Sequence, residues 1–174
     1  MYTSFNDNLT NGDTDTDIWA LPFDRNGSPG KPFPVVQTKA SENKAQFSPD
    51  GKWIAYQSDA SGRDEIYVQP FAGPEQKPGA RSQVSPGGGM DVRWGRQGTE
   101  VFYVSGDGRL MTVPIRLASE RQSLEIGAPV PLFPTLLQGS STQHRYAVSA
   151  DGQRFLMAAR ARDVANESSQ RLVT

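Results

Sequence analysis

One sequence pattern occurs three times along this chain. Residues 46–56 read QFSPDGKWIAY, residues 93–103 read RWGRQGTEVFY, and residues 147–157 read AVSADGQRFLM. A second pattern follows the first two copies and also stands upstream of them, at residues 17–23, 65–71 and 109–115. The first two copies are 47 residues apart, and periods of 40 to 50 residues are typical of modules that must stack to bury their apolar faces. The chain therefore folds as an array of similar units.

The segments between the turns have the composition of β-strands. The 17 Gly and 13 Pro residues recur at short intervals, and the runs between them are rich in Val, Ile, Phe, Tyr and Trp. Two stretches, residues 117–123 and 158–168, could each hold a helical turn, but neither has a sustained period of 3.6. The predicted fold class is all-β, with β-propeller blades of four antiparallel strands in a partial propeller of about three to four blades.

Each copy of the first pattern contains a tight turn. In Ser48-Pro49-Asp50-Gly51, proline stands at the second position of a type I turn and glycine at the fourth. This turn should join the innermost strand of a blade to the next strand, and residues 87–89 should form the crossover between two blades. We expect one partial propeller domain over residues 1–174, divided into a partial blade 1–38, blades 39–85 and 86–135, and a partial blade 136–174.

These turns and strands resemble the TolB-like β-propeller repeats of bacterial proteins, whose hallmark is a Phe-Ser-Pro-Asp-Gly turn before an apolar strand. Residues 47–56 match this hallmark closely and residues 147–157 match it well, whereas residues 93–103 keep only the second glycine and the apolar strand. The order of the modules also resembles the C-terminal propeller segment that follows some bacterial Ser/Thr kinase domains, although no kinase motif is present. The resemblance implies a binding or sensing scaffold and names no ligand.

Strand alternation predicts which residues of the innermost strands face the central channel. The buried set is Ala45, Phe47, Val92, Trp94, Tyr146 and Val148, so Trp94 is expected to be better packed than Trp53, which opens the strand after the turn. The channel set, together with the histidine beside the last inner strand, gives the predicted ligand-binding residues: Lys44, Gln46, Asp91, Arg93, His144 and Arg145. The loops expected on the same rim are residues 6–16, 39–43, 59–64, 86–90 and 136–144.

The predicted function is a non-enzymatic scaffold that binds a protein segment or a small ligand at this rim and channel mouth. The alternative is a propeller-type lyase or hydrolase with its site on the same rim. His144 is the only histidine, and neither a Gly-x-Ser-x-Gly elbow nor a His-Glu-x-x-His motif occurs. We therefore predict no catalytic residue and no cofactor.

One acidic loop is a candidate calcium site. Residues 11–17 read NGDTDTD, and the alternating carboxylates of Asp13, Asp15 and Asp17 resemble the first half of a calcium loop. An EF-hand, however, requires glycine where Ile18 stands and glutamate where Asp24 stands. A solvated acidic loop is the simpler interpretation, so no metal is predicted and calcium remains the alternative.

Composition excludes several classes of partner. Eighteen Lys and Arg residues balance nineteen Asp and Glu residues, which argues against nucleic-acid and polybasic membrane binding. No apolar run reaches the roughly 20 residues of a membrane helix, and no signal peptide is apparent, so a cytoplasmic location is the default expectation.

The first and last repeats are incomplete, and this predicts self-association. Tyr2-Thr3-Ser4 aligns with Tyr56-Gln57-Ser58, in the second strand of a blade, whereas the last repeat supplies the first two strands. Two copies arranged head to tail could close a ring of about six blades, or of about eight partly built ones. The alternative is a segment of a longer propeller. A well-folded monomer of about 19 kDa that resists dilution would contradict the dimer.

Overall fold

Four antiparallel sheets follow one another along the chain, and none of the described residues forms a helix. The computed structural model describes residues 2–5, 16–77, 79–95, 97–118, 123–137, 144–149 and 151–158. The first sheet has the order β1-β2-β3 and consists of β1 (Tyr2–Phe5), β2 (Thr16–Ala20) and β3 (Phe33–Val36). The second, with the order β4-β5-β6-β7, consists of β4 (Glu42–Phe47), β5 (Trp53–Ser58), β6 (Glu65–Pro70) and β7 (Ser82–Gln83).

The third sheet repeats this order and adds a strand. It consists of β8 (Gly89–Trp94), β9 (Glu100–Ser105), β10 (Arg109–Ala118), β11 (Ser123–Ile126) and β12 (Val130–Pro134). The first part of β10 lies between β9 and β12, whereas its last four residues pair with β11. The fourth sheet is the hairpin of β13 (Tyr146–Val148) and β14 (Phe155–Met157).

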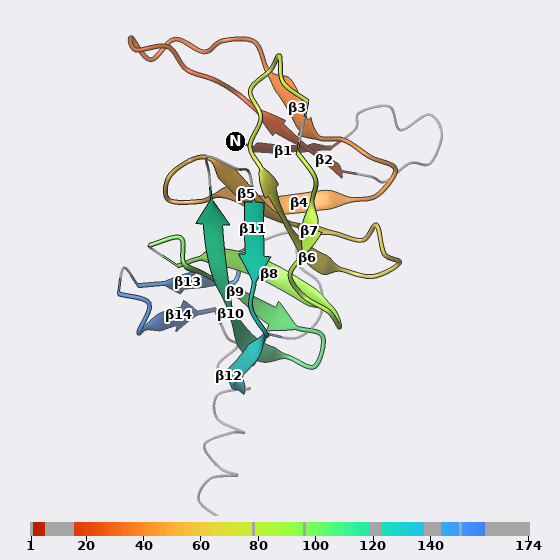
Figure 1. Cartoon of the computed structure of the whole chain (residues 1–174), viewed down its shortest axis with the longest axis vertical. Helices are drawn as coiled ribbons and strands as arrows, with labels where there is room; N and C mark the ends of the chain where they lie inside the picture. Colours follow the sequence, from red (N-terminus) through yellow and green to blue (C-terminus); the bar gives the residue numbers. More distant parts are fainter. Residues whose placement is uncertain are drawn as a thin grey trace, which may run out of the picture.

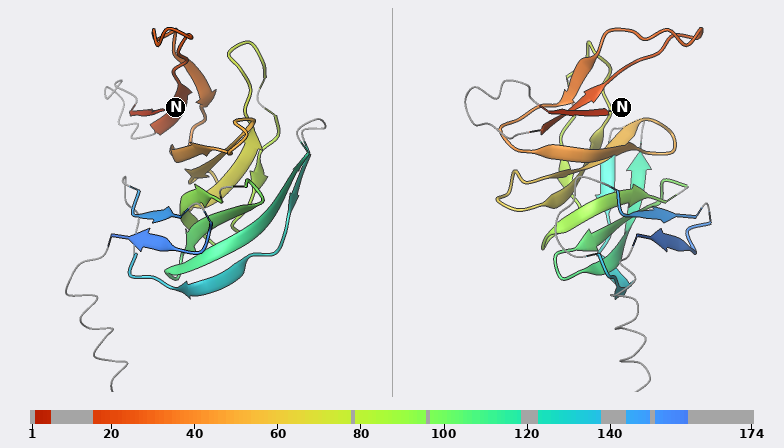
Figure 2. Two further views of the ribbon diagram at one scale, coloured as in Figure 1. Left: turned by 90° about the vertical axis from the view of Figure 1, so that its left-hand side faces the viewer. Right: turned by 180° about the vertical axis from the view of Figure 1, so that it is seen from behind.

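The sheets are arranged as successive blades of part of a β-propeller. In Figure 1 they descend from β1–β3 at the top, through the β4–β7 sheet, to β8–β12, with β13 and β14 beside the third sheet. The views in Figure 2 show the same succession as an arc of sheets, each lying against the next. The all-β partial propeller predicted from the repeats is thus confirmed.

The predicted tight turns form as the sequence pattern requires. The Gly51 amide donates to the Ser48 carbonyl at 2.9 Å, and Gly51 has a φ of +70°, which favours glycine. The Ser48 hydroxyl accepts from the Trp53 amide at 3.0 Å and donates to Asp50 at 2.6 Å. The turn at Ser149 makes the equivalent bonds, so serine and aspartate side chains fix the connection between the first two strands of a blade.

Apolar side chains pack between blades rather than inside one. On β5, Ile54 and Tyr56 face the first sheet, whereas Trp53 and Ala55 face the third. The same division occurs on β9, where Val101 and Tyr103 face the second sheet and Phe102 and Val104 face the fourth. The second strands of the second and third sheets, β5 and β9, are therefore buried on both faces, as their continuous apolar sequences predict.

Residues 117–118 extend β10 and Ser123 begins β11, so this stretch, which could have held a helical turn, forms part of a β-hairpin. Two expectations from the sequence are wrong. Trp94 was expected to be better packed than Trp53, but Trp53 is 2% exposed and Trp94 is 9% exposed, and both belong to one cluster between the second and third sheets. The other concerns Phe47, which was expected to be buried.

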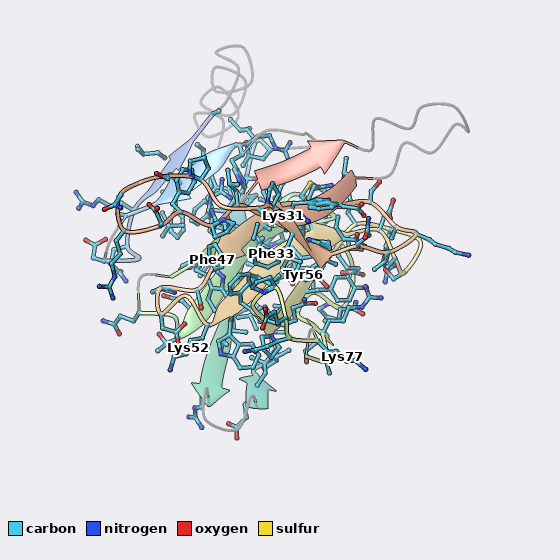
Figure 3. The ribbon with its side chains drawn as sticks, turned by 90° about the horizontal axis from the view of Figure 1, so that it is seen from above. Lys31, Phe33, Phe47, Lys52, Tyr56 and Lys77 are labelled. Atoms are coloured by element: carbon cyan, nitrogen blue, oxygen red, sulfur yellow. The ribbon has the colours of Figure 1, made fainter. Side chains whose placement is uncertain are left out.

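Phe47 is 39% exposed. Its ring packs edge-on against Phe71, with centroids 4.8 Å apart, and Phe71 also contacts Phe33 of β3 at 6.3 Å. Figure 3 labels Phe33, Phe47 and Tyr56, which gather where β3, β4 and β5 meet. A β-bulge between Asn43 and Gln46 interrupts the regular alternation of β4 before it reaches Phe47.

Because Trp53 and Trp94 share one closely packed cluster, truncating either to alanine should cost a similar amount, about 3–5 kcal/mol of unfolding free energy. Urea denaturation of W53A and W94A measures both losses. Phe23→Ala is the control, because Phe23 is largely exposed and should change stability by less than about 0.5 kcal/mol. A loss for W53A no larger than that of the control would contradict the packing described here.

Candidate functional site

Two innermost strands carry the same backbone irregularity at equivalent positions. Lys44 on β4 and Asp91 on β8 have φ angles of +53° and +57°, values that are uncommon for residues other than glycine. Each lies at a register shift, between Asn43 and Gln46 in one strand and between Met90 and Arg93 in the other. A bulge of this kind redirects the side chain of the extra residue, here towards the neighbouring blade.

The carboxylate of Asp91 binds basic side chains from the blades on both sides of it. Lys44 Nζ lies 2.7 Å from Oδ1, and Arg145 contacts Oδ2 through Nη2 at 2.6 Å and through Nε at 2.8 Å. Asp91 is fully buried and Lys44 is 4% exposed. Burial lowers the pKa of Lys44, although its bond to Asp91 opposes that effect. Asp91 therefore links the inner strands of three consecutive sheets.

Burial changes the interpretation of the predicted channel residues. Lys44, Asp91 and Arg93 are all buried, although Arg93 also reaches the lining of an open depression. The bulges turn Lys44 and Asp91 into the interface between blades. Gln46 also contacts a neighbouring blade, because its side-chain oxygen accepts from the Trp94 amide at 3.4 Å and its carbonyl accepts from the Trp94 indole at 3.3 Å.

Arg93 donates only to uncharged acceptors in the described part of the chain. Its Nε donates to the Tyr146 carbonyl at 2.9 Å, and its Nη1 donates to the Val92 carbonyl at 2.7 Å. The guanidinium carbon lies 5.2 Å from the centroid of the Tyr146 ring, a cation–π arrangement. Arg93 is 8% exposed, and burial lowers the pKa of its guanidinium. None of the ion pairs between described residues includes Arg93.

Arg93 also determines the tautomer of His144. Its Nη1 lies 2.6 Å from His144 Nδ1, and because a guanidinium can only donate, Nδ1 must accept and the ring proton must be on Nε2. Partial burial, followed by the positive charge of Arg93, lowers the pKa of His144 below its ordinary value of 6.5. His144 is therefore held neutral at pH 7, with its lone pair directed at Arg93.

These side chains meet at an open depression of about 540 Å³ beside β13 and β14. Its lining residues are Arg93, His144, Arg145, Tyr146, Ala147, Leu156, Met157 and Ala158. Three predicted site residues, Arg93, His144 and Arg145, thus lie together, whereas Lys44, Gln46 and Asp91 are not part of the lining. The apolar wall from β14 was not predicted, although the turn at Ser149 sets the pairing of Tyr146 with Met157 that places it there.

The expected rim loops also come together where they are described. Asp59, in the loop after β5, accepts from the Ser41 amide at 2.8 Å, and residues from both loops line a second depression of about 380 Å³. In the crossover at residues 87–89, Gly88 has a φ of +97° and donates to Glu65 at 2.9 Å. This confirms that the glycine run serves the crossover between blades.

The calcium alternative rests mainly on residues outside the described ones, namely Asp13 and Asp15. Asp17 is described, and its carboxylate accepts from Gln37 Nε2 at 3.0 Å. Among the described residues, no group of three or more His, Asp or Glu side chains is placed to hold a metal ion. Within the same residues, no helix has the length and apolar character needed to cross a membrane.

Known proteins resemble this chain in structure rather than in sequence. No protein-family model matches it, and no curated protein does. The crystal structure of TolB from Acinetobacter baumannii superposes with a TM-score of 0.52 over 84% of this chain, at 19% sequence identity. The aligned part spans 32% of the TolB chain. At this identity the likeness concerns the fold alone, and it supports a TolB-like propeller architecture.

Asp91→Asn should be strongly destabilising, by about 3–5 kcal/mol, because it leaves Lys44 and Arg145 with a neutral partner in a buried position. The control is Glu125→Gln, which removes an exposed ion pair with Arg116 and should cost less than about 1 kcal/mol. Chemical denaturation compares the two variants. Equal stability of D91N and the wild type would show that the three-blade ion pair contributes nothing to the fold.

His144 should titrate below pH 6.5, and Arg93→Gln should raise its pKa because the neighbouring positive charge is removed. As the only histidine, it gives a single set of imidazole signals in a proton NMR titration. Since its folded-state pKa is depressed, the unfolded chain binds the proton first, and stability should fall as the pH drops through 6.5. His144→Asn should lack that component of the pH dependence. A His144 midpoint at or above 6.5 in the wild type would contradict the arrangement.

Proposed function

We propose that this chain is a non-enzymatic propeller scaffold that binds a small ligand or a protein segment at the depression beside β13. The observation that carries the proposal is the convergence of Arg93, His144 and Arg145 with an apolar wall in one concave surface. A few polar groups in an apolar concavity provide orientation together with buried contact area. TolB-like architecture supports a scaffold role and indicates no particular ligand.

The state of His144 favours binding over catalysis. A general base needs a lone pair directed at the proton that it removes, but the Nδ1 lone pair of His144 accepts from Arg93 and its Nε2 carries the proton. No observation among the described residues favours the lyase or hydrolase alternative. That alternative, and the likeness to propeller segments that follow kinase domains, stay predictions from the sequence.

Self-association is part of the proposal. Within the described residues, the last sheet has two strands, compared with four in the second sheet, and Leu156 on β14 is largely exposed. A strand edge that has no partner among the described residues, beside an exposed apolar side chain, can accept further strands. A second copy of this chain, which offers its three-stranded first sheet, is the partner we propose.

Ala147 provides the test of the binding site, because it is exposed and lines the depression. Ala147→Trp should fill the depression, whereas Ala80→Trp places the same bulk on an exposed loop outside its lining. Ligand-observed NMR with a library of small fragments should find fragments that bind the wild type and A80W but not A147W. If every fragment that binds the wild type also binds A147W, the depression is not the binding site.

A further inference from the structure

We propose that the depression beside β13 binds an oxyanion, the carboxylate or phosphate group of a small ligand, and that Arg93 is its main counter-charge. This inference rests on the proposed function and names the chemical class of the ligand. It follows from the charge of Arg93, which has no counter-ion among the described residues, from the burial of Arg93 and from the donors of the residues that line the depression.

One carboxylate lies among three cations in this part of the protein. Lys44, Arg93 and Arg145 surround Asp91, and both oxygens of Asp91 are already bound by Lys44 and Arg145. No carboxylate among the described residues forms an ion pair with Arg93. Arg93 therefore brings a positive charge to the depression without a described counter-ion.

Arg93 is also buried. It is more than nine-tenths buried, and its described hydrogen-bond partners are two carbonyls and a neutral imidazole. A buried charge without a counter-ion is unfavourable, so an anion in the depression would gain a strong electrostatic interaction. Nε and Nη1 already donate to these partners, and the two protons of Nη2 are the guanidinium donors that an anion would take.

His144 supplies a further donor at the same place. Because Arg93 occupies Nδ1, the ring proton is on Nε2, and His144 is exposed and lines the depression. The neighbouring apolar side chains Leu156 and Met157 would contact the carbon skeleton of a small ligand. An uncharged ligand would leave Arg93 without a counter-ion, so the site favours an anion.

The imidazole of His144 is also the natural reporter, because the chain has no other histidine. The charged groups near it are Arg93, Lys44 and Asp91, with Arg145 beside them in the lining. The probes are succinate and inorganic phosphate, each added to the full chain and compared with sodium chloride at equal ionic strength. The His144 signals should shift and saturate with either probe, and the pKa of His144 should rise because a bound anion stabilises the imidazolium.

Ala147→Glu is the decisive variant, because it leaves every contact of Arg93 in place and puts a carboxylate at the mouth of the depression. A147E should show a raised His144 pKa and at least a tenfold weaker response to both probes, whereas the matched Ala80→Glu should behave as the wild type does. Arg93→Gln should also lose the response, and A147E still tests the proposal if R93Q does not fold.

Three outcomes would overturn the inference. They are a response to sodium chloride equal to that of the probes, the absence of any saturating response, and an undiminished response in A147E. If fragments still depend on Ala147 while both probes fail, only the anionic class is wrong and the proposed function stands. If no fragment depends on Ala147 either, the proposed function fails as well.

Discussion

The buried carboxylate of Asp91 is the interaction on which the arrangement of the inner strands depends. It binds a lysine from the preceding blade and an arginine from the following one, so one side chain joins three sheets. Such a group must be fully paired, because a buried charge that loses its partners is strongly destabilising. The positive φ angles at Lys44 and Asp91 are the local strain that this pairing offsets.

Apolar packing supplies the other interactions that hold the blades together. The second strands β5 and β9 bury both faces, so among the described residues the apolar clusters lie between neighbouring sheets. Hydrophobic burial is not directional, and it therefore holds the sheets together without fixing how they are aligned. The hydrogen bonds from Gln46 to Trp94, and the ion pairs of Asp91, provide that alignment.

The candidate site is a consequence of the same construction. Because Lys44 and Arg145 satisfy Asp91, the remaining cation, Arg93, turns to backbone carbonyls and to His144. The imidazole is thereby fixed in one tautomer and held neutral. Arg93 occupies the position of the repeat that is Gln46 in the preceding blade and Ala147 in the following one. This single difference gives a scaffold of similar blades one distinctive surface.

The sequence by itself determined the all-β fold, the repeating sheets and the turns. Glycine, proline, serine and aspartate determine the turns through contacts that span four to six residues. A second strand that is apolar on both faces must pack between two other sheets. It also indicated Arg93, His144 and Arg145 as neighbours. Tertiary structure alone decided which polar residues are buried. Strict alternation assigns Lys44 and Asp91 to an open channel. A bulge in each strand shifts the register and turns both side chains towards a neighbouring blade. The ion pair between them, which joins residues 47 positions apart in the sequence, makes that shift favourable.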